Sequence, residues 1–591
     1  MTQNKRSPQV VAASRLSPRR NTSTAATIAE LVDEQLRHFS IDPASEFGVS
    51  LARIARHIYD TQSDLDTLWD TTIRTVATID HADRVARFNA QKFLSFQLAK
   101  LLDNLQNSTR KSYQSLGYGQ QTVSAKGPYA VIDNITAIFS ATPVIARTAT
   151  YIYACAEWIA DAFNGKELLL EIYSRLLNPT SISLANHVVD LEAGPFAGDY
   201  LAWNFNSGMA AIDAVLSHLL GHNDVLITNR NLYGGAYQLI HDWFAKPSNL
   251  QIAVETFDGY DAAAFAACAD AAQRKYADRI AAGRCVYVYL ESPCNPHGYV
   301  LDVPAICQAA HQRKMRVVLD ATVGTPFLYR PLQREVLTER PDFVIHSCTK
   351  DMSGTGSVIA GCVIGRNDDM FLPKGEATAT TSWDQTMFWN VYYVKGAFLN
   401  ADAAFEVIQG LRTLPLRMLS KCICTDVLAR FLAAHPSVQV RCHALDDDPN
   451  APLRASLLHL GLPAPLFTVD FGALPADAFQ RFFDCLSPTF GHMISLGQSN
   501  TIVSCPALTT HSELSPAALA ASGLTPTTIR IAVGDEEPLD LIHHLRATAR
   551  LTIDPLVPGF SDQFLPHDVT CELVRQRYLA AHQRYVDSQL S

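Results

Sequence analysis

The segment 346–350 joins residue types that can carry out covalent chemistry. It follows the apolar run 342–345, which predicts a buried strand, and it ends in Lys350, with the hydroxyl residues Ser347 and Thr349 just before the lysine. A lysine amine at a strand end can bond covalently to a carbonyl carbon, and the hydroxyls can hydrogen-bond a phosphate. An ordinary surface lysine is the better interpretation of Lys350 alone, so the assignment depends on other segments of the chain.

An acid and a turn upstream of this lysine suit the same ligand. Asp320 ends the apolar run 316–320, where a carboxylate can face a protonated ring nitrogen. Ser207, Gly208 and Met209 form a small-residue turn that opens a helical pattern, and the free N–H groups at a helix start favour an anion. Each feature alone fits plain structure, but together and in this order they predict a phosphate-bearing ring ligand attached to the lysine.

Four further residues can complete such a site. Tyr233 precedes two glycines, which let its ring approach a flat ligand closely. Asn295 follows the predicted strand 285–290. Tyr173 and Arg175 can hydrogen-bond a phosphate, although a tyrosine–arginine pair of this spacing is usually a solvated turn.

Apolar strand patterns alternate with amphipathic helical patterns through the middle of the chain, as at 224–228, 285–290, 303–314 and 316–320. This alternation predicts a mostly parallel sheet with helices on both faces. Ligands on such sheets bind beyond the carboxyl ends of the strands, where Asn295, Asp320 and Lys350 fall. Later in the chain, Arg530 lies in a strand pattern and needs a carboxylate partner, either of a ligand or of a structural salt bridge.

The two ends of the chain differ from its middle. Residues 1–125 predict a disordered basic tail and a helical extension; a transit peptide is the alternative for the tail, and two early prolines argue against it. A serine- and glycine-rich linker is predicted at 104–128. The expected domains are a large ligand-binding domain at 126–410, a small C-terminal domain at 411–555 and a helical tail at 556–591.

The composition argues against several classes of function. With 48% hydrophobic and 18% charged residues, the 591-residue chain is globular, and its net charge of −10 argues against a nucleic-acid partner. Its 13 cysteines show neither a CxxC pair nor zinc-ligand spacing, so we expect no metal and reduced thiols in the cytoplasm. The longest apolar stretch, 135–146, is too short to span a membrane, so no membrane partner is expected.

As a set, these motifs resemble the Cys/Met-metabolism family of pyridoxal phosphate (PLP) enzymes, the cystathionine γ-synthase, γ-lyase and β-lyase group. The resemblance covers residues from about 171 to about 551. It implies an α/β protein of PLP-dependent transferase fold type I, like aspartate aminotransferase, with a mostly parallel sheet flanked by helices and a smaller α/β C-terminal domain. It also implies pyridoxal 5'-phosphate as the cofactor.

The resemblance implies a role for each residue of the site. Lys350 corresponds to the lysine that bonds the cofactor, Asp320 to the partner of the pyridine nitrogen, and Tyr233 to the tyrosine that stacks on the ring; these three are the expected catalytic residues. Ser495 and Arg530 are the expected substrate-binding residues, with Arg530 holding the α-carboxylate. The full expected cofactor-binding set is Tyr173, Arg175, Ser207, Gly208, Met209, Tyr233, Asn295, Asp320, Ser347, Thr349 and Lys350.

Tyr173 and Arg175 look like the family's element that reaches the cofactor phosphate of a neighbouring subunit. A homodimer or homotetramer with shared active sites is therefore expected. Two departures from the family pattern stand out: the segment 351–357 replaces a glycine–histidine pair after the lysine, and Gly235 stands where methionine γ-lyases typically place a cysteine. The second departure argues mildly against that member of the family.

The expected reaction is γ-replacement on an O-acylated homoserine, as in a cystathionine γ-synthase or an O-acylhomoserine thiol-transfer enzyme. The alternative within the family is a C–S lyase that performs γ- or β-elimination, like cystathionine γ-lyase. An aminotransferase on the same fold is disfavoured by the motif set. The alternative from another class is a non-catalytic PLP-fold protein with a regulatory or interaction role.

Overall fold

The computed structural model describes residues 25–38, 41–75, 78, 80–100 without 84, 87–88, 91 and 99, 140–151, 156–163, 173–472, 474–509, 519 and 523–590. The chain divides into two compact units, Met1–Val144 with Ile152–Leu170 and Ile145–Tyr151 with Glu171–Ser591. Most of the predicted basic tail and all of the predicted linker at 104–128 lie outside the described residues. The predicted domain boundaries within the second unit stay predictions.

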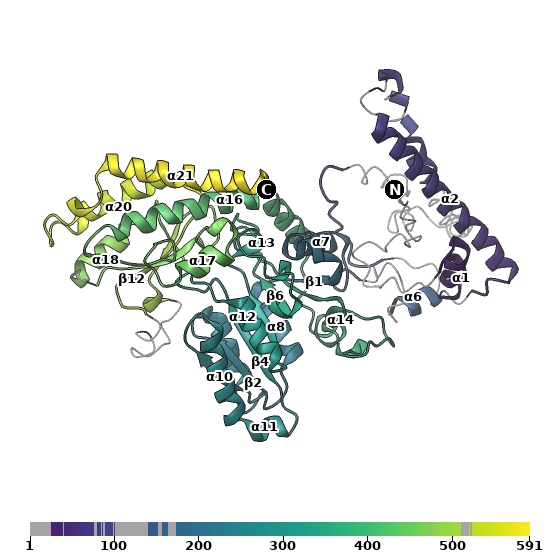
Figure 1. The fold of residues 1–591 in the computed structure, drawn as a ribbon, viewed down its shortest axis with the longest axis horizontal. Helices are drawn as coiled ribbons and strands as arrows, with labels where there is room; N and C mark the ends of the chain where they lie inside the picture. Colours follow the sequence, from purple (N-terminus) through teal and green to yellow (C-terminus); the bar gives the residue numbers. More distant parts are fainter. Residues whose placement is uncertain are drawn as a thin grey trace, which may run out of the picture. The chain divides into compact units, whose positions relative to one another are not determined.

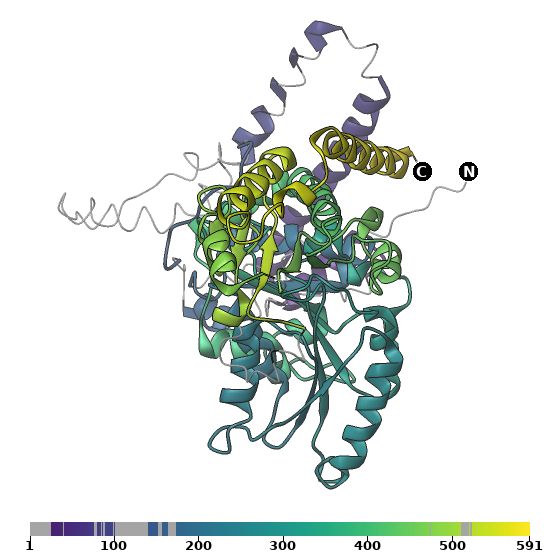
Figure 2. The same cartoon turned by 90° about the vertical axis from the view of Figure 1, so that its left-hand side faces the viewer.

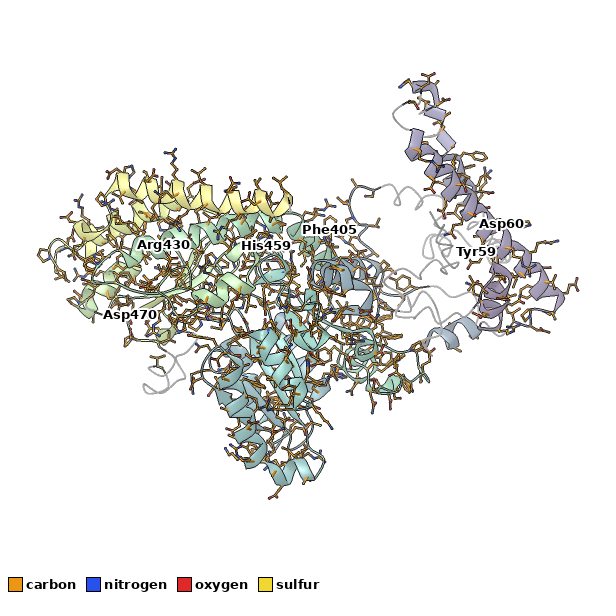
Figure 3. The ribbon with its side chains drawn as sticks, in the orientation of Figure 1. Tyr59, Asp60, Phe405, Arg430, His459 and Asp470 are labelled. Atoms are coloured by element: carbon orange, nitrogen blue, oxygen red, sulfur yellow. The ribbon has the colours of Figure 1, made fainter. Side chains whose placement is uncertain are left out.

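The first unit contains an amphipathic helical pair. The helices of this unit whose bounds are described are α1 (Ile28–His38), α2 (Glu46–Thr75) and α6 (Ala156–Phe163). Val32 and Leu36, one turn apart on α1, are buried with Ala52 of α2. The amide of Gln35 donates a hydrogen bond of 2.9 Å to the hydroxyl of Tyr59, which Figure 3 labels on α2. The apolar spacing in the sequence thus forms the contact between α1 and α2.

A seven-stranded sheet, some of whose strands are labelled in Figure 1, forms the centre of the second unit. Its strand order is β1-β7-β6-β5-β4-β2-β3. β2, β3, β4, β5 and β6 run parallel, and β7 is antiparallel to both β1 and β6. This topology confirms the predicted mostly parallel sheet. The strands are β1 (Tyr200–Phe205), β2 (Val225–Asn229), β3 (Ala253–Phe257), β4 (Val286–Glu291), β5 (Arg316–Asp320), β6 (Phe343–His346) and β7 (Gly361–Arg366).

Helices cover both faces of this sheet, because its strands are apolar on both sides. Val317 of β5 is buried in one core cluster with Ile306 of α12. Phe343 of β6, whose side chain points to the opposite face, meets the ring of His218 on α8 edge-on at 5.9 Å. The principal helices are α7 (Pro179–Ala193), α8 (Gly208–Leu219), α9 (Gly234–Gln238), α10 (Ala262–Lys275), α11 (Ala277–Ala281), α12 (Val303–Gln312), α13 (Thr325–Leu328), α14 (Asn367–Met370), α15 (Tyr393–Lys395) and α16 (Ala401–Ala433).

The C-terminal part of the second unit contains a smaller sheet, in the order β10-β11-β12-β9-β8. Its strands are β8 (Gln439–Arg441), β9 (Leu466–Asp470), β10 (Gly491–His492), β11 (Ile502–Ser504) and β12 (Thr528–Ala532). Asp470, labelled in Figure 3, ends β9 and accepts a hydrogen bond from Thr527 at 2.8 Å. The remaining helices are α17 (Ala451–Leu457), α18 (Ala476–Asp484), α20 (Pro538–Thr552) and α21 (His567–Leu590).

The helix α21 packs along α16, as the yellow and green helices of Figures 1 and 2 show. Phe431 of α16 stacks on Phe564, just before α21, at a centroid distance of 5.1 Å. Arg430 of α16 forms ion pairs with Asp426 and Asp446 beside this contact (Figure 3). The helix predicted in the tail at 556–591 therefore belongs to the second unit. No helix among the described residues is both long and apolar enough to cross a membrane.

Candidate active site

A cavity of about 210 Å³ lies where the carboxyl ends of β4, β5 and β6 meet the smaller sheet. It brings together residues that are far apart in the sequence. The predicted site residues that line it are Ser207, Gly208, Met209, Tyr233, Asn295, Asp320, Ser347, Thr349, Lys350, Ser495 and Arg530. The other lining residues are Ile212, Glu291, Thr322, Val323, Ile359, Ile494 and Leu496.

The amine of Lys350 faces this cavity. Its Nζ donates a hydrogen bond of 2.8 Å to the hydroxyl oxygen of Ser495, which comes from the C-terminal part of the unit. Burial lowers the pKa of Lys350, and the nearby charge of Arg530 lowers it further, while Asp351 opposes the shift. A lysine whose neutral form is favoured in this way can act as a nucleophile or as a general base.

Two buried carboxylates stand side by side at the base of the cavity. Glu291 ends β4 and Asp320 ends β5, and the two are register partners across these strands. Burial raises the pKa of both carboxyl groups, and the proximity of Asp320 raises that of Glu291 further. Asp320 accepts hydrogen bonds from the hydroxyl of Tyr289 at 3.4 Å and from the N–H of Thr322 at 3.0 Å. Neither carboxylate has a lysine or arginine partner among the described residues, so a cationic ring nitrogen would be stabilised here.

The start of α8 forms the anion side of the cavity. Ser207 is the N-cap of this helix and accepts a hydrogen bond from the N–H of Ala210 at 3.1 Å, while the first N–H groups of a helix have no partner within it. A Cβ at Gly208 would lie 2.6 Å from the Cβ of Ser347, so only glycine lets the two segments approach each other. The N–H of Ser347 donates to the hydroxyl of Thr322 at 2.8 Å. These features fit a phosphate group.

Thr349, which the family resemblance assigns to the phosphate, is engaged with the backbone. Its hydroxyl donates to the carbonyl of Ala360 at 3.1 Å and accepts from the N–H of the same residue at 2.9 Å. This double hydrogen bond ties the segment before Lys350 to the segment before β7. A contact with phosphate would require the hydroxyl to release the carbonyl of Ala360.

Tyr233 and Gly235 form a close contact on the wall of the cavity. Tyr233 precedes α9, and its N–H donates to the carboxylate of Glu291, which also accepts from the N–H of Asn295 at 2.9 Å. A Cβ at Gly235 would lie 2.7 Å from a ring carbon of Tyr233 and 2.9 Å from the sulfur of Met209. The glycine therefore lets the tyrosine ring take its place over the cavity.

This contact gives a testable prediction. Replacing Gly235 by cysteine should displace the Tyr233 ring and lower kcat/KM by about tenfold to a hundredfold, because small misplacements of a positioned group are costly. The Gly198→Cys variant is the matched control, since a Cβ at Gly198 meets nothing within 4 Å. A Gly235→Cys enzyme with the kinetics and cofactor affinity of the Gly198→Cys enzyme would contradict the assigned contact.

Arg530 lies in β12 with 1% of its surface exposed. Its Nη1 donates to the side-chain oxygen of Asn295 at 3.1 Å, and its Nη2 donates to the carbonyl of Ser495 at 2.7 Å. The Nε has no hydrogen-bond partner among the described residues, and burial lowers the pKa of the guanidinium to about 10. Among the described residues, its hydrogen bonds go to an amide oxygen and a backbone carbonyl rather than to a carboxylate, so its charge is suited to a ligand carboxylate.

Tyr173 and Arg175 do not line the cavity. Arg175 donates from Nη1 to the carbonyl of Tyr393 at 2.8 Å, and Tyr173 is partly exposed. The structure thus separates these two residues from the nine predicted cofactor-binding residues that line the cavity of the same chain. Glu291, Thr322 and Tyr289 are missing from the predicted set, although Glu291 directly follows the predicted strand 285–290.

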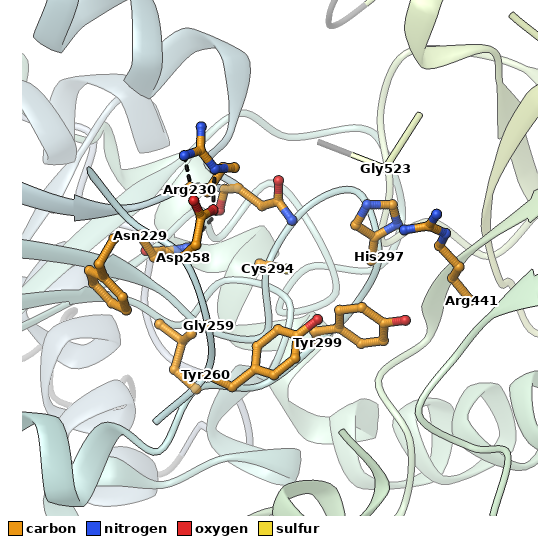
Figure 4. Close-up of a pocket in the computed structure, with 13 residues that line it drawn as sticks. Asn229, Arg230, Asp258, Gly259, Tyr260, Cys294, His297, Tyr299, Arg441 and Gly523 are labelled. Atoms are coloured by element: carbon orange, nitrogen blue, oxygen red, sulfur yellow. Dashed lines mark hydrogen bonds and ion pairs between the residues drawn. The ribbon is translucent and has the colours of Figure 1, made fainter. Parts of the chain in front are cut away.

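A second cavity, of about 340 Å³ (Figure 4), shares no lining residue with the first. Cys294, His297 and Arg441 are among the residues that line it, while Asn295 faces the first cavity. None of the predicted site residues lines this second cavity. Among the described residues, no group of three or more His, Cys, Asp or Glu side chains is arranged to hold a metal ion.

The sheet topology and the lysine at the end of β6 define a PLP-dependent enzyme of fold type I. The chain belongs to the family of Cys/Met metabolism PLP-dependent enzymes, whose model matches residues 133–549. Its cofactor is therefore PLP, and its relatives are lyases and synthases that act on sulfur amino acids and homoserine esters. Because these relatives are enzymes, the alternative of a non-catalytic protein is rejected.

Several relatives show how far the likeness extends. L-methionine gamma-lyase of Pseudomonas deceptionensis is 30% identical over 428 residues, covering 72% of this chain and 96% of the relative. O-succinylhomoserine sulfhydrylase of Mycobacterium tuberculosis is 30% identical over 399 residues, covering 67% and 88%. The crystal structure of cystathionine gamma synthase from Xanthomonas oryzae pv. oryzae in complex with cystathionine has a TM-score of 0.58 at 27% identity, covering 71% and 96%.

One solved relative carries the cofactor itself. A Campylobacter jejuni protein assigned as an O-acetylhomoserine (thiol)-lyase contains N'-pyridoxyl-lysine-5'-monophosphate, and it matches with a TM-score of 0.60 at 27% identity over 70% of this chain and 96% of that one. In the present chain, the lysine, the buried acids and the free helix start face one cavity. These residues fit the same group.

Proposed function

We propose that this protein catalyses a PLP-dependent γ-replacement, in which a thiol takes the place of the acyloxy group on the γ-carbon of an O-acylated homoserine. The observation that carries the proposal is the pairing of a half-buried amine and a buried guanidinium in one cavity. Lys350 offers an amine with a lowered pKa, and Arg530 offers an Nε without a partner among the described residues. One suits proton transfer at carbon, and the other suits an amino-acid carboxylate.

Individual residues divide the work of this reaction. When bound, PLP supplies an electron-withdrawing ring that stabilises negative charge on the substrate carbons. Arg530 binds the α-carboxylate and orients the substrate, and Lys350 takes the proton from the α-carbon and then moves a proton at the β-carbon. Asp320 would keep the ring nitrogen protonated, and Tyr233 would pack against the ring.

The wall of the cavity favours an uncharged group on the γ-carbon. Ile359 and Ile494 line the cavity with 67% and 71% of their surfaces exposed, so the substrate would meet apolar side chains there. In γ-replacement the Cγ–O bond breaks and the acid leaves, a C–S bond forms with the thiol, and the thiol proton passes to a base. An ester or a thioether suits this wall better than a charged group does.

Elimination is the second candidate, because several relatives are L-methionine gamma-lyases. In elimination water completes the reaction, which yields a 2-oxo acid and ammonia in place of a thioether. The two candidates are separated by assaying the purified enzyme on O-acetyl- and O-succinylhomoserine with and without an added thiol. Thioether formation that suppresses ammonia release supports replacement, whereas ammonia release that is indifferent to thiol supports elimination.

We also propose that the enzyme works at least as a dimer in the cytoplasm. Tyr173 and Arg175 lie outside the cavity of their own chain, which supports a role for them in the active site of a second subunit. All twelve cysteines among the described residues are free thiols, which supports a reducing compartment. Sedimentation of the purified enzyme with and without bound PLP tests the assembly.

A further inference from the structure

A buried ion pair lies directly behind Lys350. Lys421, on α16, donates a hydrogen bond of 2.8 Å to the carboxylate of Asp351, the residue that follows Lys350. The two side chains are enclosed, with exposed fractions of 0% and 2%. Such a pair adds little net stability, because the loss of hydration offsets most of the attraction between the charges. Its position beside the reactive lysine therefore calls for a role other than stability.

The same ammonium group joins two segments of the site. Besides Asp351, Nζ of Lys421 donates to the carbonyl of Gln498 at 2.6 Å. Gln498 belongs to the segment 495–499, which comes from the C-terminal part of the unit. Arg417, one turn earlier on α16, donates to the carbonyl of Asp351 at 2.8 Å. α16 thus holds the residue after the reactive lysine at two points and the segment 495–499 at one.

The first residue of the segment 495–499, Ser495, accepts hydrogen bonds from both Lys350 and Arg530. The hydroxyl of Ser495 accepts from Lys350, and its carbonyl accepts from Arg530. A shift of this segment along the chain direction would break both hydrogen bonds together.

At Gly497 the segment 495–499 touches the backbone of Lys350 and Asp351 directly. Gly497 has φ +74°, and a Cβ there would lie 2.5 Å from the N atom of Asp351 and 2.8 Å from the Cβ of Lys350. The hydroxyl of Ser499 donates to the carbonyl of Gly354 at 3.2 Å. A movement of one segment is therefore passed directly to the other.

We propose that Lys421 and Asp351 are positioning residues that hold the segment 495–499 in register with Lys350, so that Ser495 meets the lysine and Arg530 at once. This inference rests on the proposed function and adds two residues to its machinery. Among the described residues, the charged side chains of Arg417 and Asp535 and the thiol of Cys422 also lie close to the pair. Removal of the pair should disturb both substrate binding and the environment of the lysine.

The double variant Asp351→Leu/Lys421→Met tests this role. It removes both buried charges at nearly constant volume, so its melting temperature should stay within about 5 °C of the parent. We expect kcat/KM to fall by about a hundredfold, with KM raised, because the substrate-binding and proton-transfer groups lose their alignment. In the holoenzyme, the pH titration of the cofactor's visible absorption should shift to lower pH, since Asp351 is the charge of the pair that acts on Lys350 and stabilises a protonated nitrogen there.

The matched control is Lys275→Met, which breaks the exposed ion pair with Glu255 and should leave all three measurements unchanged. A double variant with the parent's KM and titration midpoint would overturn the inference. Should the double variant melt far below the parent, Asp351→Asn decides, because its amide oxygen still accepts from Lys421. We then expect Asp351→Asn to keep the parent's KM and Asp351→Ala, which offers Lys421 no acceptor, to raise it, and equal KM values for these two variants overturn the inference. The absorption titration needs no substrate, so an error in the proposed reaction would leave this test intact.

Discussion

Replacing Lys350 by alanine should abolish turnover, with a fall in kcat of at least about a thousandfold, because the variant loses the group that moves protons at the substrate carbons. The structure supports a large effect for two reasons. The amine is the only lysine nitrogen among the residues that line the cavity, and its lowered pKa favours the neutral, reactive form. Water has no comparable position from which to replace it.

Covalent trapping separates this effect from a loss of folding. Borohydride reduction of the parent holoenzyme should leave the cofactor's mass on the peptide that contains Lys350, and the alanine variant should show no such adduct. Lys395→Ala serves as the control, because that lysine pairs with Asp213 on the surface outside the cavity. An adduct on another lysine of the alanine variant, together with retained activity, would show that the base has been assigned wrongly.

Replacing Arg530 by leucine should raise KM for the amino-acid substrate by about a hundredfold or more, since the loss of one partner from a buried charged pair costs about 2–5 kcal/mol. Arg340→Leu is the matched control, because Arg340 is another buried arginine but hydrogen-bonds backbone carbonyls outside the cavity. Both variants lose a buried arginine, so equal losses of melting temperature with unequal KM values would assign the carboxylate to Arg530. Equal KM values would contradict that role.

The Arg530→Leu variant should also change the pH dependence of kcat. The positive charge of Arg530 lowers the pKa of Lys350, because it disfavours a second positive charge nearby. Without that charge the pKa rises, so the lysine becomes neutral only at higher pH and the acid limb of the kcat profile moves to higher pH. An acid limb at the parent's position would show that the two side chains do not interact.

The local patterns in the sequence predict the central sheet and the part of the site that lies on it. Asp320 ends one apolar run and Lys350 follows another by five residues, and parallel strands bring such ends to one edge. Glu291 is missed as a site residue because its role is to accept the N–H groups of Tyr233 and Asn295, a contact between loops that no periodicity encodes.

The C-terminal half of the cavity could not be derived in this way. Ser495 and Arg530 come from a separate sheet, and their approach to Lys350 depends on how two sheets pack rather than on any spacing along the chain. Their assignment came from a family resemblance. The pair of Asp351 and Lys421 could not be predicted for the same reason. A lysine in the middle of a long helix is expected to be exposed, and only the fold shows that Lys421 contacts an acid.

The position of Tyr173 and Arg175 outside their own cavity has a consequence for how activity depends on concentration. Under the proposed assembly, a lone chain has the lysine and the arginine for the substrate but lacks two groups that hold the phosphate. Dilution below the dissociation constant of the dimer would then release the cofactor and abolish activity, although every subunit would remain folded. Catalysis would then require the dimer. A higher concentration of cofactor and a higher concentration of subunits would each increase the fraction of active enzyme.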